Sequence, residues 1–326
     1  MKAGTTLRPR TAGLALRIAV AFAAAPGLSF VASQPPAFAK DVGQQSFATR
    51  EDAVAALIDA MRRNDIPALR AMLGPDTDRL VNSGDRTADL AMRRTFLAAY
   101  DEKHDLLGEG PDRAVLTVGA DAWPLPLPLV RTGGRWRFDT QRGIEQIVDR
   151  RIGRNEIAAI RTALAYVDAQ KLYFEMTQRE GHAEFARHLV STPGKQDGLY
   201  WPAAADAPQS PLAPLVAQAM QEGYPGARVS GRQRPYHGYF FRILTAQGSH
   251  APGGAMNYLA NGRMTKGFGL VAWPARYGIS GVMSFIVSQD GVVFQKDLGQ
   301  STKAVAAVMP RFDPDLSWTR VDVVSP

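Results

Sequence analysis

The stretch from residue 235 to residue 299 constrains the fold of this 326-residue chain more than any other. Aromatic and β-branched residues dominate three of its segments, which is the composition of strands with at least one apolar face. These segments are residues 239–245, 268–273 and 282–287. Asp290 and Gly291 then form the residue pair most typical of a β-hairpin turn. The stretch therefore predicts an antiparallel sheet.

A long amphipathic helix precedes this stretch and is predicted over residues 155–177. Its apolar positions recur at a spacing of three and four. They are Ile157, Ile160, Leu164 and Val167. Residues 143–154 are basic and polar and are interpreted as a linker. Residues 143–326 thus predict a second domain in which a long helix packs on an antiparallel sheet. The stretch 199–215 is predicted to lie over the surface, and residues 247–266 are predicted to be a loop.

The first domain is predicted over residues 40–142, with helices first and strands afterwards. Thr49 is placed to cap a first helix, Pro67 begins a second, and a third covers residues 86–100. Strands follow over residues 114–118, 127–131 and 135–139. Segregated helices and strands indicate an α+β fold. The helix segment FATREDAVAALIDAMRRNDIPALRAML and the hairpin TGGRWRFD resemble secreted relatives of the nuclear transport factor two-like cone fold, which implies a cone-like domain.

The first 39 residues have the three parts of a secretory signal peptide. A basic start is followed by an apolar run over residues 18–25 and by the small-residue pattern Ala37-Phe38-Ala39. Cleavage is predicted before Lys40. Prolines interrupt the apolar run well short of the roughly 20 residues that a membrane-spanning helix needs. We therefore expect a periplasmic or secreted protein that is not an integral membrane protein after leader cleavage.

Composition and motifs exclude several classes of function. Lys and Arg exceed Asp and Glu by 7 in the whole chain, and four of the basic residues lie in the leader, so the excess after residue 39 falls to 3 and nucleic-acid binding is not expected. There is no cysteine, which removes disulfides and thiolate chemistry. His182 and His188, with Glu180 and Glu184 nearby, lack the spacing of a helical metal site, and no phosphate loop is present, so no metal and no cofactor is predicted.

Three segments carry a resemblance to a known family. They are RRIGRNEIAAIRTALAYVDAQKLYF, RPYHGYFFRILTAQGSHAPGGAMNYLANG and GFGLVAWPARYGISGVMSFIVSQDGVVFQKDLG. With them the mature chain resembles the bacterial secreted family known as domain of unknown function 2950, which implies no particular activity. The helix, the strand HGYFFRI and the hairpin WPARYGISGVMSFIVSQDGVV are also similar to the soluble heads of type IV pilin-like proteins. The polar segment IEQIVDRRIGR stands where pilins have their apolar stem, which disfavours filament formation.

Three functions from different classes remain open. The preferred one is a non-enzymatic envelope module that binds a ligand, or a second envelope protein, through aromatic residues on loops. The candidate binding residues are Tyr236, His237, Tyr258, Trp273 and Tyr277. The first alternative is a periplasmic hydrolase in which His237 works with a nearby carboxylate such as Asp290 or Asp297. The second is a pilus or secretion accessory protein. Asp101 and His104 are interpreted as a solvated helix end rather than an acid/base pair.

Overall fold

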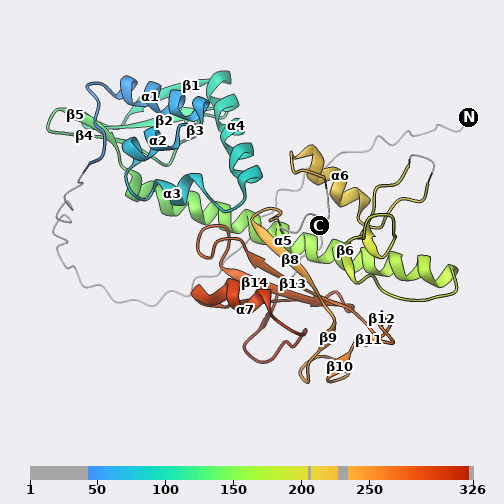
Figure 1. Ribbon diagram of the computed structural model, residues 1–326. Coiled ribbons are helices and arrows are strands. Elements are labelled where there is room, and N and C mark those ends of the chain that lie inside the picture. Colours follow the sequence, from blue (N-terminus) through green and yellow to red (C-terminus); the bar gives the residue numbers. More distant parts are fainter. Residues whose placement is uncertain (1–42, 205–206, 227–233, 323–326) are drawn as a thin grey trace, which may run out of the picture. The chain divides into compact units, whose positions relative to one another are not determined.

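The computed structural model describes residues 43–204, 207–226 and 234–322 (Figure 1). The predicted leader, residues 1–39, and its cleavage point before Lys40 lie outside these residues. The described chain combines helices with antiparallel sheets, and a long helix precedes the larger C-terminal sheet. The prediction of an α+β fold is therefore confirmed.

The N-terminal lobe has helices first and a sheet afterwards, as predicted. Its elements are α1 (Arg50–Arg63), α2 (Ile66–Leu73), α3 (Thr77–Val81), α4 (Arg86–Glu102), β1 (His104–Gly108), β2 (Arg113–Val118), β3 (Trp123–Pro124), β4 (Leu129–Thr132) and β5 (Arg135–Phe138). The sheet order is β1-β2-β4-β5, with β3 also paired to β2. Thr49 caps α1 by accepting a hydrogen bond from the Asp52 amide at 3.0 Å. Apolar residues of α1, α2 and the sheet form a separate core, exemplified by Leu57, Leu69 and Phe138.

Helix α5 (Thr140–Arg179) is 40 residues long and includes residues 143–154, so the prediction of a linker there was wrong. Residues 143–154 are helical because their apolar and basic positions also have partners. Ile144 and Val148 are buried. The guanidinium of Arg151 donates to the carbonyl oxygens of Arg79, at 2.8 Å, and Leu80 at the end of α3. The first third of α5 therefore packs against the N-terminal lobe instead of connecting it loosely.

The C-terminal lobe is built on the remainder of α5. Its further elements are β6 (His188–Val190), β7 (Gly198–Tyr200), α6 (Ala213–Gln221), β8 (Tyr239–Leu244), β9 (Ala246–Gln247), β10 (Met256–Asn257), β11 (Leu259–Ala260), β12 (Arg263–Met264), β13 (Gly269–Pro274), β14 (Met283–Ser288), β15 (Val293–Asp297), the 3-10 helix Gly299–Ser301, α7 (Thr302–Ala307) and β16 (Thr319–Arg320). The main sheet has the antiparallel order β16-β15-β14-β13-β8, as the alternating sequence predicts.

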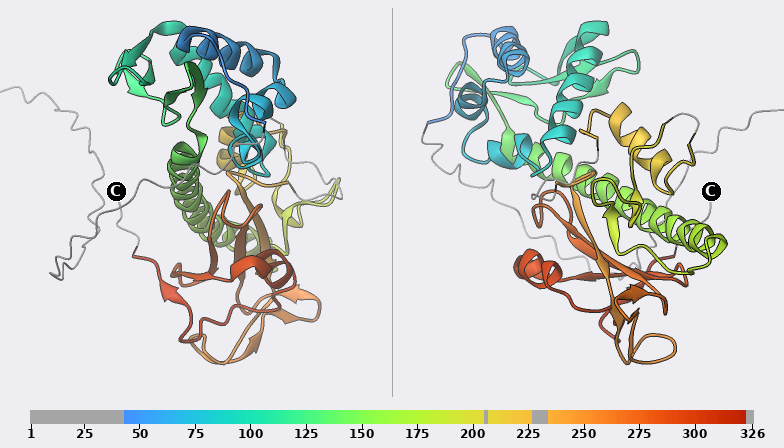
Figure 2. Two further views of the ribbon diagram at one scale, coloured as in Figure 1. Left: turned by 90° about the vertical axis from the view of Figure 1, so that its left-hand side faces the viewer. Right: turned by 45° about the vertical axis from the view of Figure 1, so that its right-hand side comes forward.

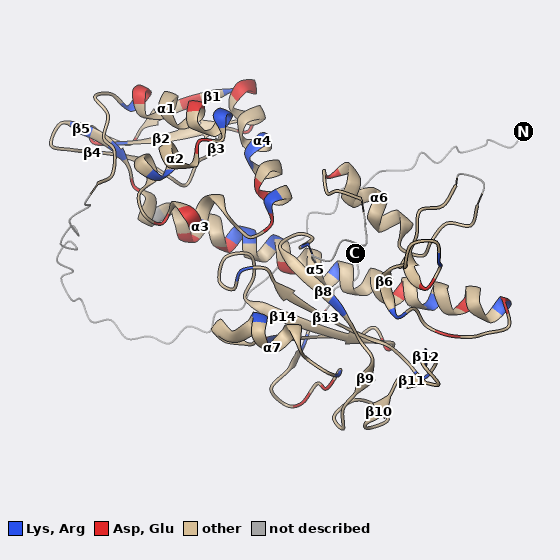
Figure 3. Cartoon of the chain, in the orientation of Figure 1, with Lys and Arg blue, Asp and Glu red and all other residues tan. Residues whose placement is uncertain are grey.

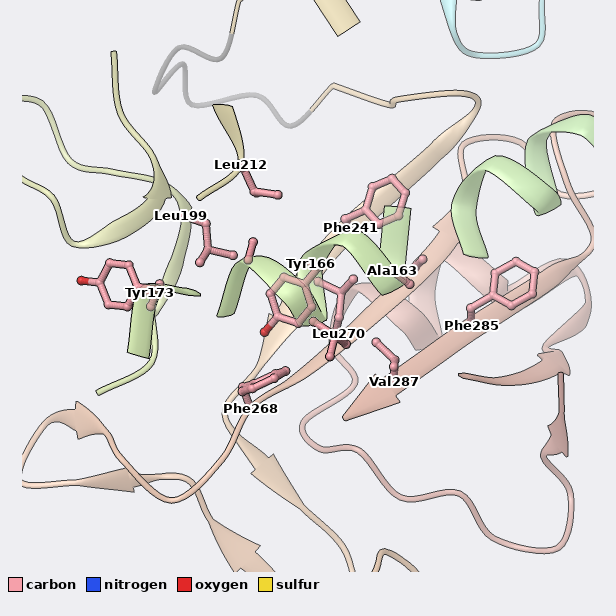
Figure 4. Close-up of a cluster of buried hydrophobic side chains, with 14 of the residues drawn as sticks. Ala163, Tyr166, Tyr173, Leu199, Leu212, Phe241, Phe268, Leu270, Phe285 and Val287 are labelled. Carbon is pink, nitrogen blue, oxygen red and sulfur yellow. The ribbon is translucent and has the colours of Figure 1, made fainter. Parts of the chain in front are cut away.

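Helices cover both faces of this main sheet (Figure 2). Side chains alternate along β8 and β13, so Phe241 and Leu270 join the core on the α5 side, whereas Leu244 and Val271 join a second core on the α7 side. Figure 4 shows the α5 side, where Ala163 and other residues of the helix meet the strands.

The face of α5 that is buried against the sheet consists of Ala159, Ala163, Tyr166 and Val167. The predicted apolar stripe was therefore wrong at Ile157, which is 36% exposed, and right at Val167.

Two stretches that were predicted as irregular chain differ from the prediction in burial or in strand pairing. The stretch 199–215 was interpreted as surface material, but Leu199, Trp201 and Leu212 are buried in the core beside α5. The stretch 247–266 contains two short ladders, β9–β10 and β11–β12, and Tyr258 within it is fully buried. Both predictions were wrong at these positions because proline and glycine content indicates turns but not what the intervening apolar residues contact.

Candidate functional site

A cavity of 240 Å³ opens at the C-terminal end of α5. Its wall combines aromatic and acidic side chains with one histidine. These residues are Tyr173, Glu180, His182, Glu184, Asp197 and Trp201. They come from the last turns of α5, the loop that follows it, and the segment around β7. Figure 3 shows acidic and basic residues interspersed along this end of the helix. We call this feature the α5-end cavity.

Trp201 is placed in the wall by the short parallel ladder of β6 and β7. A Cβ atom at Gly198 would lie 2.7 Å from the Ser191 amide nitrogen, so only glycine lets the two strands approach this closely. Leu199 is fully buried in the core and fixes the strand that leads to Trp201. Trp201 is 7% exposed, and its Nε1 atom is buried with no hydrogen-bond partner among the described residues. Trp201 therefore adds an aromatic surface to the wall, while its indole nitrogen is buried.

Three carboxylates give the cavity a negative potential. Burial, followed by the charges of Glu184, Asp197 and Glu180, raises the pKa of Tyr173 to about 12, so the phenol is within electrostatic reach of all three. Burial alone would raise the pKa of Asp197, but hydrogen bonds from the Thr192 amide and hydroxyl outweigh it and hold this pKa below its ordinary value. Asp197 is therefore ionised at neutral pH.

Two cationic groups partly balance these acids. Arg263 Nε lies 2.9 Å from Glu184 Oε2. His182 Nε2 lies 3.5 Å from Glu180 Oε2 and 3.9 Å from Glu184 Oε1, which makes it a partner of both when protonated. The described part of the chain contains no group of three or more His, Asp or Glu residues placed to hold a metal ion.

A second polar cluster surrounds the turn between Tyr236 and Tyr239. The two residues exchange backbone hydrogen bonds of 2.8 and 3.0 Å, and His237 and Gly238 between them have φ angles of +47° and +75°. Positive φ at both central positions is typical of a type I′ turn and is unusual for a residue other than glycine. His237 Nε2 lies 3.0 Å from Glu222 Oε2, although this contact forms no hydrogen bond of ordinary geometry.

Asp85 holds this turn from the N-terminal lobe. Its buried carboxylate accepts hydrogen bonds from the Gly238 amide at 2.9 Å, the Tyr224 hydroxyl at 2.8 Å and, at the start of α4, the Ala88 amide at 3.1 Å. The Tyr224 hydroxyl in turn accepts the His237 amide at 3.0 Å. Burial and then the charge of Asp85 raise the pKa of Tyr224. We call these residues, with Glu222 and Tyr236, the Asp85 cluster.

The Asp85 cluster places an imidazole beside a carboxylate, which is an arrangement suited to proton transfer. The His237 ring packs against Tyr224 and Tyr236, with ring centroids 5.7 and 4.2 Å away. Both side chains of the pair remain about one-third exposed, at 31% for His237 and 32% for Glu222. The pair is therefore accessible from solvent and has its orientation fixed from behind.

The structure brings together only two of the five predicted binding residues, Tyr236 and His237. Tyr258 is fully buried, with its hydroxyl donating to Gln247 Oε1 at 2.9 Å. Trp273 is also buried, on the α7 side of the sheet. Tyr277 lies on the loop between β13 and β14. The ligand-binding role of the five residues remains a prediction, and two of them offer almost no surface to a ligand.

The carboxylates expected beside His237 are elsewhere. The Tyr277 hydroxyl donates to Asp297 Oδ2 at 3.1 Å, and the Gly299 amide donates to Asp297 Oδ1 at 2.7 Å. Asp290 lies in the β14–β15 hairpin loop. The carboxylate beside His237 is that of Glu222, and not that of Asp290 or Asp297 as predicted. The helix end is as interpreted, because Asp101 pairs with Arg62 while the His104 ring stacks on Tyr100 at 3.8 Å.

Sequence reasoning missed the residues that complete both sites. Glu222 and Tyr224 follow α6 with no recognisable motif, and Asp85 had a signal only as a helix cap. Trp201 could have been noticed as a tryptophan within a short apolar run, LYW, in an otherwise proline- and alanine-rich stretch. Nothing in the local sequence indicates that its indole nitrogen lacks a partner.

Comparison with known proteins gives one match. The family model described as protein of unknown function 2950 matches residues 44–321. No curated protein and no solved structure matches the chain, so the likeness to pilin heads rests on the sequence pattern alone. No helix within residues 43–204, 207–226 and 234–322 is both long and apolar enough to cross a membrane.

Proposed function

The chain belongs to this family of unknown function, and from its own geometry we propose that it is an exported module that binds a small molecule in the α5-end cavity. Export is supported by the leader pattern of residues 1–39. Binding is supported by the concave site, which joins aromatic walls to a few polar groups as ligand sites commonly do. The proposal places the protein in the periplasm or outside the cell.

The make-up of the cavity wall carries this proposal. Tyr173 and Trp201 line it and are only 6% and 7% exposed, so packing holds their rings in place. Glu180, His182 and Asp197 bring polar groups to the same wall. Ligand sites commonly combine such aromatic surface with a small number of polar groups.

The other polar groups of the cavity favour binding over catalysis. Thr177 has the one side-chain hydroxyl on the lining besides that of Tyr173, and it is committed to the backbone. Its Oγ1 atom lies 3.0 to 3.1 Å from the carbonyl oxygens of Tyr173, Phe174 and Glu184, which compete for its single proton. It also accepts the Glu184 amide at 3.1 Å. A nucleophile needs a hydroxyl free to lose its proton to a base, which this one is not.

A cavity-filling variant tests the proposal. Gln196 borders the cavity and is exposed, and its backbone carbonyl, which accepts the Tyr173 hydroxyl, is unaffected by a side-chain change. We expect Gln196→Trp to abolish binding of small polar fragments detected by ligand-observed NMR. Lys195→Trp, at the neighbouring exposed position, is the matched control and should bind as the natural protein does. Equal fragment binding by both variants would place any binding site outside this cavity.

Export is tested separately by N-terminal sequencing of the protein recovered from the periplasm or medium. The expected first residue is Lys40, because the Ala37-Phe38-Ala39 pattern directs cleavage after Ala39. Recovery in the cytoplasm with Met1 retained would refute export without affecting the binding proposal.

A second candidate, a hydrolase, is favoured by the 3.0 Å contact between His237 and Glu222. In it the carboxylate orients the imidazole, which takes a proton from attacking water. The protein offers a matched control, because His250 Nδ1 lies 3.0 Å from Asp313 Oδ1 in another surface pair. If the hydrolase is correct, His237→Gln lowers cleavage of p-nitrophenyl acetate at least about tenfold while His250→Gln does not. Equal rates for the two variants would dismiss it.

The pilus or secretion accessory function remains a prediction with no structural observation in its favour. A polymerising helix needs a free apolar stem, whereas the first turns of α5 are already covered. Ile144 and Val148 are buried, and the Arg151 guanidinium is bound to α3. Detection of the protein in sheared filaments would revive this function.

A further inference from the structure

We infer that one face of α5 is a docking surface for a membrane of anionic phospholipids. The side chains of this face are Arg150, Arg154, Ile157 and Arg161, and Trp123 of β3 lies beside Arg150. We call these five residues the arginine stripe. They lie outside the α5-end cavity, so the inference goes beyond the proposed binding function and does not depend on it.

The three arginines have no counter-charge in the protein. All three are exposed, and within the described part of the chain none of them has an ion-pair or hydrogen-bond partner. In contrast, the exposed Arg62 and Arg63 of α1 each pair with a carboxylate. Partial burial lowers the pKa of Arg154, and the charge of Arg150 lowers this pKa further. The two cations therefore repel each other, and a bound anion would relieve this repulsion.

The helix places these charges in one row. At 100° per residue the three arginines lie within about 40° of one another around the axis of α5, and they span roughly 16 Å along it. The acidic residues of this part of α5 lie about 100° or more away from each arginine. These acids are Glu145, Asp149 and Glu156. The row ends before Asp168, which is the next charged residue on the same face. A straight row of cations fits an extended anionic surface better than one small ion.

The two apolar members of the arginine stripe favour a membrane over a dissolved polyanion. Trp123 is 41% exposed and Ile157 is 36% exposed. The Arg150 guanidinium lies 5.6 Å from the centroid of the Trp123 ring, which joins the ring to the row of charges. Tryptophan is enriched at the level of lipid headgroups, where one part of the ring is apolar and its N–H is solvated. Arginine combined with tryptophan and aliphatic residues is typical of helices that lie in a membrane interface.

The opposite side of the main sheet also has exposed apolar residues and provides a control. Val305 and Val308 of α7 are 43% and 75% exposed. Helix α7 packs through Ala306 on the face of the sheet that α5 does not cover (Figure 2). A flat membrane cannot contact both sides of the sheet at once. Helix α7 has one cation, Lys303, whereas the arginine stripe has three.

Sedimentation with vesicles tests the inference. The protein is used in its exported form, the chain from Lys40 onward, so that the basic leader does not contribute. One set of vesicles contains equal parts of phosphatidylglycerol and phosphatidylcholine, and the other contains phosphatidylcholine alone. We expect binding to the anionic vesicles to be at least about tenfold tighter at ~0.1 M salt, and to weaken as the salt concentration rises toward ~1 M.

Two triple variants with the same net charge locate the surface. The stripe variant combines Arg150→Gln, Arg154→Gln and Arg161→Gln, and the control combines Lys303→Gln, Arg311→Gln and Arg320→Gln at exposed positions of the C-terminal lobe. Each cation at an anionic surface contributes about a fivefold change in affinity. We therefore expect the stripe variant to bind the anionic vesicles at least about twentyfold more weakly, and the control to bind them within about threefold of the natural protein.

Fluorescence quenching gives a second measurement that does not depend on the folding of the stripe variant. Brominated phosphatidylcholine in the anionic vesicles quenches tryptophans that enter the interface. We expect this quenching in the natural protein, and we expect Trp123→Phe to remove most of it. Trp318→Phe is the matched control, because Trp318 is a partly buried tryptophan on the α7 side of the sheet. This variant should be quenched as the natural protein is.

The remaining outcomes would each overturn the inference. No binding, or equal binding to the two sets of vesicles, would refute an anionic membrane. Weak binding of the control triple variant, or loss of quenching in Trp318→Phe, would place the surface elsewhere. Release from the vesicles by inorganic phosphate, at an ionic strength at which chloride has no effect, would replace the membrane by a discrete phosphate ligand. Tighter binding to soluble polyglutamate than to the vesicles would indicate an acidic macromolecule instead.

Discussion

The Asp85 cluster and the α5-end cavity are both polar regions with buried groups, but they differ in how those groups are satisfied. The Asp85 carboxylate accepts three hydrogen bonds, one of them from the Tyr224 hydroxyl, which itself accepts the His237 amide. The indole nitrogen of Trp201 donates none within the described part of the chain. A polar network completed by the chain itself stabilises and orients the fold.

A pair of side chains that resembles a catalytic pair is not by itself evidence of a functional site. His237 attracts attention because an imidazole beside a carboxylate resembles catalytic pairs, yet its backbone and ring are held by partners within the protein. The α5-end cavity also places an imidazole, that of His182, 3.5 Å from Glu180, but it combines them with a concave wall of aromatic residues, which is the form of a ligand site. For this reason we rank the binding function above the hydrolase.

Of the changes that separate the Asp85 cluster from the α5-end cavity, Asp85→Ala is expected to have the largest effect. The change leaves the Gly238 amide and the Tyr224 hydroxyl without their acceptor and removes the cap of α4. We expect a loss of about 3 kcal/mol in the free energy of unfolding, measured by urea denaturation.

Asp78→Ala is the control for this change. Asp78 lies on the same lobe and pairs with Arg276 at 2.9 Å, but its side chain is 44% exposed. Exposed ion pairs contribute about 0–1 kcal/mol, so little loss is expected. Similar losses for the two variants would show that the buried network is not what joins the regions.

The next effect, about 2 kcal/mol, is expected from Gly238→Ala. Its φ of +75° disfavours a side chain, and a Cβ atom would lie 2.4 Å from Asn155 Nδ2 and 3.0 Å from Ser280 Cβ. Gly278 has a similar φ of +70° but open space around it, so Gly278→Ala isolates the backbone strain. Thermal denaturation should show the larger decrease for Gly238→Ala, and an equal decrease would mean that the turn is loosely packed.

A smaller effect is expected at alkaline pH, where each region contributes one tyrosine. Burial, supported by neighbouring carboxylates, raises the pKa of Tyr173 and of Tyr236 to about 12. Unfolded tyrosine ionises near pH ~10, so the unfolded chain loses these protons first. The stabilising contribution is therefore present below pH ~10 and is lost as the pH rises toward 12.

We expect the unfolding free energy to fall less steeply above pH ~10 in Tyr173→Phe and in Tyr236→Phe than in the natural protein. Tyrosinate absorbance of the natural protein minus that of each variant gives the individual titration. A midpoint near pH ~10 for either tyrosine would show that its phenol is as well solvated in the folded protein as in the unfolded chain.

The smallest effect is expected from Trp201→Phe in the absence of ligand. Removing an unpaired donor costs no hydrogen bond, so the unfolding free energy should stay within about 1 kcal/mol of the natural value. Together with the large loss for Asp85→Ala, this result would establish the contrast between the two regions. A loss of several kcal/mol would mean that the indole nitrogen has a partner after all.

The fold could be predicted further than either site. The alternation in 239–245 and the stripe at Ile160 and Leu164 depend on local periodicity, which is why the sheet and its helix were recognised. The helical nature of residues 143–154 was missed because it depends on contacts made by Arg151 with a segment about 70 residues earlier.

The sites escaped prediction for the same reason. Asp85 and Gly238 are separated by 153 positions in the chain, and no sequence motif links Glu222 to His237. The cavity depends on the close approach of two three-residue strands at Gly198. Periodicity describes the neighbours of a residue in sequence, whereas these contacts depend on neighbours in space.

The continuity of α5 also has a consequence for how this chain can vary. Each residue of an α-helix advances by 1.5 Å and turns by about 100°. Arg151 meets α3, Asn155 donates to the Ser280 carbonyl at 2.8 Å, and Tyr166 donates to the Gly269 carbonyl at 3.0 Å, all from one uninterrupted rod. Adding or deleting one residue between Arg151 and Tyr166 would rotate one set of contacts away from the other. We therefore expect α5 to tolerate substitutions at its exposed positions better than a change in its length.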